Sequence, residues 1–171
     1  MTDGVPRRLD AILLVREDRA HTKELLDRLS PDAFVTTGLG GGTWSPKDLV
    51  GHLETWEQFA LEAIEAIDRG EPAPITQQPL DTDERNRQEV ERKAGHSAAD
   101  ISASAVITHD RLVVALGELA DDRWDAPEGD GSERSVGDRL GSILGGSRGH
   151  FRHDPDHWAD LESFADGRRS G

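Results

Sequence analysis

Apolar residues recur at helical spacing along four stretches of the chain. Between residues 46 and 69 they stand three and four apart and form one stripe, made of Leu49, Leu53, Trp56, Ala60, Ala63, Ile64 and Ile67. Such a stripe is typical of a helix with one buried face. Similar spacing marks residues 6–29, residues 97–119 and the stretch from residue 135 to 151, and no run alternates with the period of two that a strand requires. The pattern predicts four helices and no strand.

Local signals place the starts of these helices. Ser45 is followed by Pro46, which suits the first helical position, and by Asp48, which completes an S-x-x-D capping box. The same box recurs at residues 97–100 and 135–138. Residues 16–24 of the first helix are heavily charged, which predicts either a solvated face or an interhelix contact.

The connection between the second and third helices is long for a bundle. Residues 71–80 carry prolines, and residues 81–93 are polar with few apolar anchors, which predicts a short helix lying over one end of the bundle. We therefore expect an all-α protein: an antiparallel four-helix bundle with a short extra helix between helices two and three. The long connection permits a crossover topology. A length of 171 residues suits a single domain spanning 1–171.

Composition excludes several kinds of site. The chain has no cysteine, so it forms no disulfide, zinc–thiolate site or cysteine nucleophile. Its 34 acidic residues against 20 Lys and Arg give a net charge of −14, which argues against nucleic acid as a partner. No stretch approaches the roughly 20 apolar residues of a membrane span, and the N-terminus lacks a signal-peptide core. We expect a cytoplasmic protein without a nucleic-acid or membrane partner.

Three of the seven histidines lie close together near the end of the sequence. His150, His153 and His157 are three and four residues apart, which places them on one side of a continuous helix. Pro155 interrupts this arrangement. Either the helix kinks there, or it stops near His153 and restarts with Asp154 as its cap.

These histidines have two interpretations. Two of them together with His52, on the second helix, would make a three-nitrogen site suited to zinc, nickel or iron(II), with coordination positions left open for water or substrate. Alternatively, the cluster is a solvated surface that is salt-bridged to Asp154 and Asp156.

The segment from Trp44 to Glu57, W-S-P-K-D-L-V-G-H-L-E-T-W-E, resembles the W-S-x-K-D-x-x-x-H-L-x-x-W-E signature of DinB-like four-helix bundles. Residues 83–86, D-E-R-N, are similar to the D-x-x-N segment before helix three in these proteins. Residues 145–152, G-G-S-R-G-H-F-R, are similar to their A-G-N-T-Y-G-H-Y-R segment. The resemblance is closest to the colibactin self-resistance proteins of the ClbS/DfsB type and to the N-terminal domain of mycothiol-dependent maleylpyruvate isomerases.

The resemblance implies that His52 is the first metal ligand and that His150 is the first of a histidine pair on helix four. The family spaces that pair four residues apart, but here the residue four after His150 is Asp154. His153 and His157 keep the family spacing and lose the match to G-H-F-R. The third ligand is therefore His153, Asp154 or His157, or the chain works without a metal, as some members of the superfamily do.

The activities of the superfamily imply a reaction with an electrophile. We expect a small detoxifying or self-resistance hydrolase that opens a strained cyclopropane or aziridine ring in a reactive metabolite. One alternative is a metal-dependent transferase or isomerase that uses a low-molecular-weight thiol. The other is a binding protein that sequesters a drug without catalysis or forms a homodimer through a bundle face. Since the chain lacks cysteine, the attacking group is water or an exogenous thiol.

Ring hydrolysis needs a base or metal that activates water, and a proton donor. The candidates for water activation are His52 together with the helix-four histidines, or the carboxylates of Asp48 and Glu57.

Three further residues are candidates for substrate binding. Trp44 follows a glycine-rich loop at the start of the second helix, where its indole can stack on a planar ligand. Trp56 is a second candidate, although a role as a core anchor competes with it. The resemblance adds Asn86 as a substrate contact.

Overall fold

The computed structural model describes residues 4–169, and this part of the chain contains helices and no β-strand. The five longest helices are α1 (Arg8–Leu26), α3 (Pro46–Asp68), α5 (Ala98–Glu118) and, with 12 residues each, α4 (Thr82–Lys93) and α8 (Trp158–Arg169). The shorter elements are α2 (Pro31–Phe34), η1 (Leu39–Gly41), η2 (Pro74–Gln77), α6 (Asp121–Asp125), α7 (Val136–Ile143) and η3 (Asp154–His157). This confirms the all-α prediction, including the short helix between the second and third long helices.

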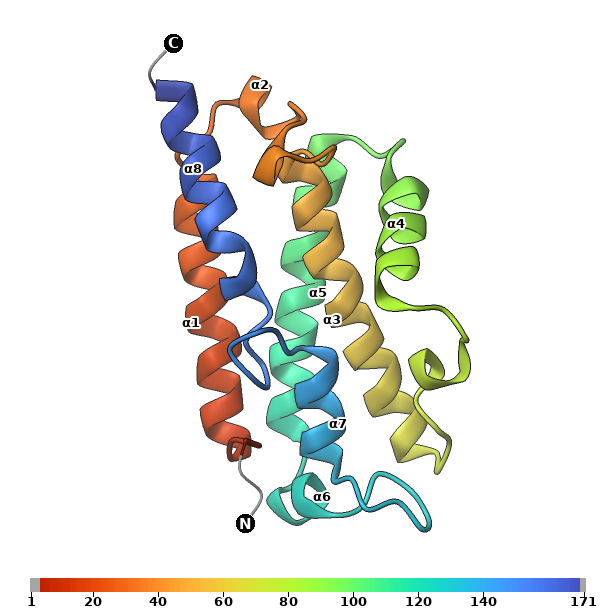
Figure 1. Cartoon of the computed structure of the whole chain (residues 1–171). Helices are drawn as coiled ribbons and strands as arrows, with labels where there is room; N and C mark the ends of the chain where they lie inside the picture. The colour runs from red at the N-terminus through yellow and green to blue at the C-terminus, as the bar shows by residue number, and fades with distance from the viewer. Residues whose placement is uncertain (1–3, 170–171) are drawn as a thin grey trace.

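The fourth position of the bundle is divided between two helices. In Figure 1, α7 lies at the end where the chain starts, and α8 lies beside α1 at the opposite end. The sequence predicts one helix through residues 135–151, but α7 already ends at Ile143. A loop follows, in which Phe151 adopts a positive φ of 60°, and the chain becomes helical again at η3, with Pro155 in its first turn. The chain thus restarts before Pro155, as one of the two alternatives had it, but the preceding helix stops at Ile143 and not near His153, and His153 instead of Asp154 occupies the N-cap position.

Helices α3 and α5 run in the same direction, and α4 carries the chain back between them (Figure 1). Side-chain contacts show the parallel order. Glu54 accepts a hydrogen bond from Thr108 at 3.2 Å, and Glu57, one turn further along α3, contacts His109 at 2.7 Å. The long connection thus makes the crossover that the sequence permits.

The capping box fixes the start of α3. The Asp48 backbone N–H donates to Ser45 Oγ at 3.2 Å, and the Ser45 N–H donates to Asp48 Oδ2 at 2.8 Å. Both are bonds that the S-x-x-D pattern predicts. Since the first residue of the helix is fixed, the position of His52 in its second turn is fixed as well.

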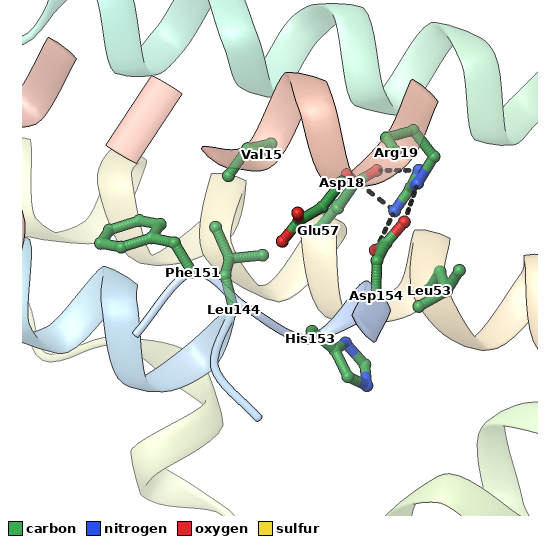
Figure 2. Close-up of a pocket in the computed structure, with 9 residues that line it drawn as sticks. All are labelled: Val15, Asp18, Arg19, Leu53, Glu57, Leu144, Phe151, His153 and Asp154. Atoms are coloured by element: carbon green, nitrogen blue, oxygen red, sulfur yellow. Dashed lines mark hydrogen bonds and ion pairs between the residues drawn. The ribbon is translucent and has the colours of Figure 1, made fainter. Parts of the chain in front are cut away.

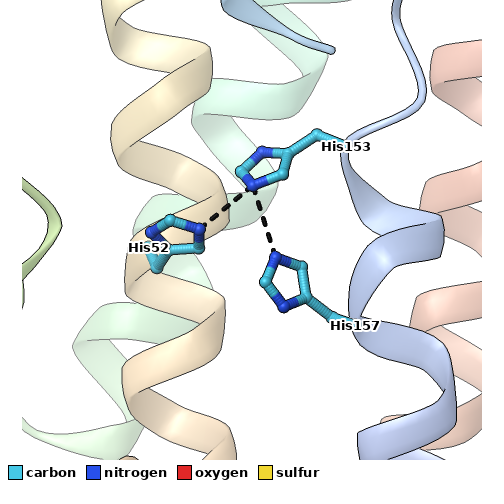
Figure 3. A group of neighbouring side chains, drawn as sticks. All are labelled: His52, His153 and His157. Atoms are coloured by element: carbon cyan, nitrogen blue, oxygen red, sulfur yellow. Dashed lines mark hydrogen bonds between the residues drawn. The ribbon is translucent and has the colours of Figure 1, made fainter. Parts of the chain in front are cut away.

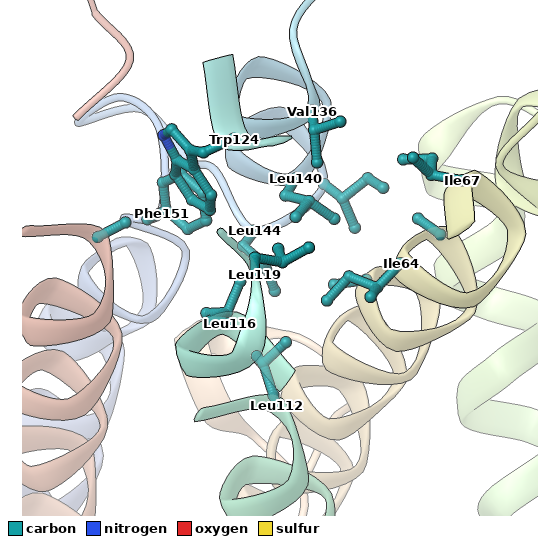
Figure 4. Packing of buried hydrophobic residues seen from close by; sticks show 14 of the residues in the cluster. Ile64, Ile67, Leu112, Leu116, Leu119, Trp124, Val136, Leu140, Leu144 and Phe151 are labelled. Atoms are coloured by element: carbon teal, nitrogen blue, oxygen red, sulfur yellow. The ribbon is translucent and has the colours of Figure 1, made fainter. Parts of the chain in front are cut away.

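The main hydrophobic core fills the end of the bundle where α3, α5 and α7 meet (Figure 4). Leu112, Leu116 and Leu140 are fully buried there, and the rings of Trp124 and Phe151 stack with centroids 5.5 Å apart. Burying one such leucine contributes about 1.5–3 kcal/mol. A second cluster, formed by Leu25, Leu39, Leu49, Leu53 and Leu161, joins α8 to α1 and α3. It holds the C-terminal helix against the segment of α3 that carries His52.

Candidate metal centre

Three histidines from distant parts of the chain meet between α3 and η3 (Figure 3). His52 Nε2 lies 3.0 Å from His153 Nε2, and His157 Nε2 lies 3.3 Å from the same atom. His153 directly precedes η3 and His157 ends it, so the single turn of η3 sets the two rings side by side. His52 is only 4 % exposed. His153 and His157 are half-buried, and their rings lie against each other and against His52.

Hydrogen bonding does not account for both short contacts. An imidazole nitrogen carries either one proton or one lone pair, so His153 Nε2 has the capacity for one good hydrogen bond. A divalent cation accepts a lone pair from each ring at once. Tetrahedral zinc with Zn–N bonds of ~2.0–2.1 Å separates its nitrogen ligands by roughly 3.3 Å, close to the two contacts seen here. The donor set fits zinc, nickel or iron(II).

Burial keeps these imidazoles neutral. It lowers the pKa of His52 to about 2, with further lowering by the nearby charges that His153, His157 and Lys93 would carry. Burial, followed by the repulsion from His157, lowers the pKa of His153 to about 4. The pKa of His157 is also lowered, chiefly by burial. At neutral pH all three rings keep the free lone pair that a metal ligand needs.

The structure does not bring His150 into this centre. Its Nε2 lies 2.8 Å from Asp138 Oδ1 on α7, because the loop after Ile143 reverses direction and turns this ring back onto α7. Asp154 is not directed at the centre either, since its carboxylate faces Arg19. Among the alternatives left open by the sequence, the structure brings together His52, His153 and His157. Of these, His153 and His157 are the pair with the family spacing of four residues.

A buried ion-pair network lies behind η3 (Figure 2). Asp154 accepts hydrogen bonds from Arg19 Nε at 2.8 Å and Nη2 at 3.1 Å, and from Thr22 Oγ1 at 2.8 Å. Trp158 Nε1 donates to Thr22 Oγ1 at 2.9 Å. The network ties η3 and the start of α8 to α1. Sequence analysis did not single out Arg19, although the charged stretch 16–24 offered an interhelix contact as one alternative.

Glu57 belongs to this ion-pair network and is not part of the cluster formed by the three histidines. Arg19 Nη1 donates to Glu57 Oε2 at 3.2 Å, and His109 Nδ1 lies 2.7 Å from Glu57 Oε1. Glu57, Arg19 and His153, together with apolar residues such as Val15 and Leu53, also line a cavity of about 20 Å³, which is room for one water molecule. Both oxygens of Glu57 are engaged, which leaves it less suited to activating water than the sequence suggested.

An open groove lies near the histidines, between the start of α3 and α4. It has a volume of about 390 Å³, within the usual range for small-molecule sites, and is lined by Thr43, Trp44, Asp48, Asp83, Asn86, Arg87, Val90 and Glu91. The Trp44 ring lies 4.9 Å from the ring of His52, centroid to centroid. Trp44, Asp48 and Asn86, three of the residues singled out in the sequence, thus gather at one groove.

Trp56 does not line this groove but supports it. Its Nε1 donates to Asn86 Oδ1 at 3.0 Å, and its ring centroid lies 6.5 Å from that of His52. Because the Asn86 oxygen is engaged, its amide N–H groups are left to donate to a ligand.

The fold and the site together place the chain in a class of protein: an all-α bundle with a candidate metal centre between its helices. In this centre, one histidine of a long helix meets two histidines carried by a later helical turn. The family model of the DinB superfamily matches residues 14–153. The chain therefore belongs to the DinB superfamily, as the resemblance implied.

Solved structures show the same fold. An uncharacterised protein from Escherichia coli UTI89 superposes with a TM-score of 0.78 at 14 % identity, over 96 % of both chains. The colibactin self-resistance protein ClbS, solved in complex with a double-stranded DNA, superposes with a TM-score of 0.67 at 13 % identity, over 97 % of this chain and 96 % of that one. No curated protein matches the sequence. Among residues 4–169, no helix has the length and apolar character needed to cross a membrane.

Proposed function

We propose that this protein is a detoxifying hydrolase that opens the strained ring of a small electrophilic metabolite, with a divalent cation held by His52, His153 and His157. The observation that carries the proposal is the convergence of three neutral imidazole nitrogens at a buried point beside an open groove. Three protein ligands leave coordination positions open, which is the pattern of a catalytic rather than a structural site.

The groove residues supply the remaining functions. A bound divalent cation provides Lewis acidity, which acidifies water and polarises carbonyl groups. The Trp44 indole offers a flat face on which a planar ligand stacks. The Asn86 amide donates a hydrogen bond to the heteroatom that gains charge as the ring opens. Asp48 uses one oxygen in the capping box and contributes negative charge to the groove.

We propose a small molecule, and not DNA, as the partner. The net charge of −14 opposes binding to a phosphate backbone, and the groove itself carries Asp48, Asp83 and Glu91 against Arg87. The DNA in the ClbS crystal belongs to that protein's complex. Retention of a DNA duplex by this chain at moderate salt would contradict this part of the proposal.

The test combines metal content with ring opening. Protein purified without a histidine tag is analysed for zinc, nickel and iron, then incubated with an activated cyclopropane and an activated aziridine in thiol-free buffer containing ¹⁸O-labelled water. We expect about one equivalent of metal and incorporation of labelled oxygen into the product. His52→Ala should lose both while its far-UV helicity is retained. His96→Ala, a change at an exposed histidine, is the matched control and should keep both.

The other outcomes assign different functions. Turnover that requires an added thiol, with sulfur in the product, would establish a thiol transferase. Tight binding of the electrophile without its consumption would establish a sequestering protein. Full activity of His52→Ala would remove the histidine centre from the mechanism.

A further inference from the structure

A strip of the exposed surface of α5 is apolar, although the chain as a whole is strongly charged. Exposed small and apolar residues recur along this strip at helical spacing, with Asp110 among them: Ala99, Ala103, Val106, Ile107, Val114 and Gly117. The other exposed residues of α5 are polar or charged: Asp100, Ser102, Ser104, Arg111 and Glu118. Val106, Ile107 and Val114 are each 58–60 % exposed. Exposed helix faces normally carry charged and polar residues, so this face departs from the expected pattern.

Helix α1 continues the apolar face. Arg8, in its first turn, donates to the carbonyl of Gly117 in the last turn of α5 at 3.0 Å, which shows that the two helices lie side by side and antiparallel. Leu9 and Leu13 point outward from α1 and are 62 % and 50 % exposed. Of the six large hydrophobic residues that are exposed among residues 4–169, five lie on α1 and α5, and the sixth is Val35.

A groove of about 750 Å³ runs between these two helices. Small and apolar side chains such as Ala20, Ala105 and Val106 line most of it. The apolar surface extends beyond the groove to Leu9 and Val114 at the far end of both helices. A small ligand would fill the groove and leave that extension in water, whereas a second helical surface would cover all of it.

Several charged residues line the groove. Arg19 pairs with Asp154 and Lys23 with Asp27, whereas Arg16 on α1 and Asp110 on α5 form no ion pair within residues 4–169. These two charges indicate what that second surface is. When two copies pack face to face about a two-fold axis that runs between these helices and parallel to them, α1 of one copy faces α5 of the other. Each Arg16 then meets an Asp110 of the partner subunit, so the face is complementary to itself. An anionic membrane surface offers no such match to a protein of charge −14.

We propose that the chain forms a two-fold symmetric homodimer through the α1/α5 face. Helices of 19 and 21 residues that lie side by side cover roughly 28 Å by 20 Å. The corrugated accessible surface of such a face approaches the ~800 Å² per partner of a stable interface. Leu13 and Val106 are the central apolar contacts, and the Arg16–Asp110 pairs fix the register. This proposal is independent of the metal centre and of the proposed function.

The experiment is sedimentation of the full chain over a range of concentrations. The native protein should sediment at twice the 18.7 kDa of the single chain. Leu13→Glu with Val106→Glu should sediment as a monomer, because four carboxylates would then be buried in the interface. Val35→Glu introduces the same charge at the exposed hydrophobic residue outside α1 and α5, and it should leave the dimer intact. Far-UV circular dichroism confirms that each variant is folded.

A charge exchange tests the register. Asp110→Arg places like charges together and should raise the dimer dissociation constant about tenfold or more, and adding Arg16→Asp should restore it. A monomeric native chain, a dimer that persists in the double-glutamate variant, or an exchange that fails to restore binding would each overturn the proposal. Metal content and ring opening by the monomeric variant should stay unchanged. The oligomeric state therefore tests the dimer, and the metal and activity assays test the proposed function independently of it.

Discussion

At the scale of single residues, the decisive property is the protonation of the buried imidazoles. His52 sits on the second turn of α3 with its pKa held far below the ordinary value, and the pKa of His153 is lowered as well. Burial of these two rings costs free energy only when the imidazole is protonated. Their effect on folding therefore depends on pH.

We predict that the metal-free protein becomes less stable as the pH falls below 6.5. Unfolded histidines bind protons at that ordinary pKa, whereas folded His52 and His153 stay neutral down to about pH 2 and 4. The unfolded state then binds more protons, so stability is complete above pH 6.5 and is lost as the pH falls. At about pH 5, the loss is about 2 kcal/mol for each of the two residues.

Urea unfolding of metal-free protein at neutral pH and near pH 5 measures this loss. His52→Gln should give a flatter dependence of the unfolding free energy on pH, because the glutamine does not titrate. Parallel pH profiles of the variant and the native chain would contradict the assignment to His52.

At the scale of elements, η3 is the part that sets the geometry of the centre. It carries both His153 and His157, and its position against α1 depends on the buried pair between Asp154 and Arg19. The neutral replacement Asp154→Asn leaves the Arg19 guanidinium without the carboxylate that it binds with two nitrogens.

We predict that Asp154→Asn weakens zinc binding by about 10–100-fold and destabilises the fold by about 3 kcal/mol, because η3 loses its anchor and a buried charge loses a partner. Competition with a chromophoric chelator measures the affinity. Glu128→Gln removes the partner of Arg139 elsewhere in the bundle and is the matched control, with unchanged zinc affinity. Equal zinc affinity in both variants would show that η3 holds its position without Asp154.

The sequence predicted those elements whose signals are local. The S-x-x-D box and Pro46 located the start of α3, and with it His52, because capping involves residues three apart. The interruption between α7 and η3 was not predicted at its true place. It depends on Phe151 adopting a positive φ, which is uncommon for residues other than glycine.

The partners of the buried charges could not be predicted from the sequence either. Arg19 and Asp154 are 135 residues apart, and only the packing of η3 on α1 shows that they pair. The resemblance to the family motif implied that His150 belongs to the centre. In the folded chain its ring contacts Asp138 instead. Local pattern identified the right kinds of side chain, and tertiary packing selected among them.

At the scale of the whole molecule, a cation at the centre would bind the folded chain and not the unfolded one. We predict that a chelator lowers the midpoint of thermal unfolding. Free zinc at about 100 times its dissociation constant stabilises the fold by about 2.7 kcal/mol, which corresponds to roughly 5–10 °C for a chain of this size.

Calorimetry with and without chelator measures this shift. His52→Ala is the control and should unfold at one temperature under both conditions. An equal response of the two proteins to the chelator would show that the metal acts elsewhere.

The separation of the ligands along the chain has a consequence for biosynthesis. His52 and His153 are 101 residues apart, so the ribosome adds His52 long before its partners exist. A nascent chain that ends before residue 153 can build α1, α3 and α5, but it offers an incoming cation a single nitrogen. If the centre holds the proposed cation, the chain can acquire it only after η3 packs against α3, and a prematurely terminated chain would neither retain the ion nor carry out chemistry that depends on it.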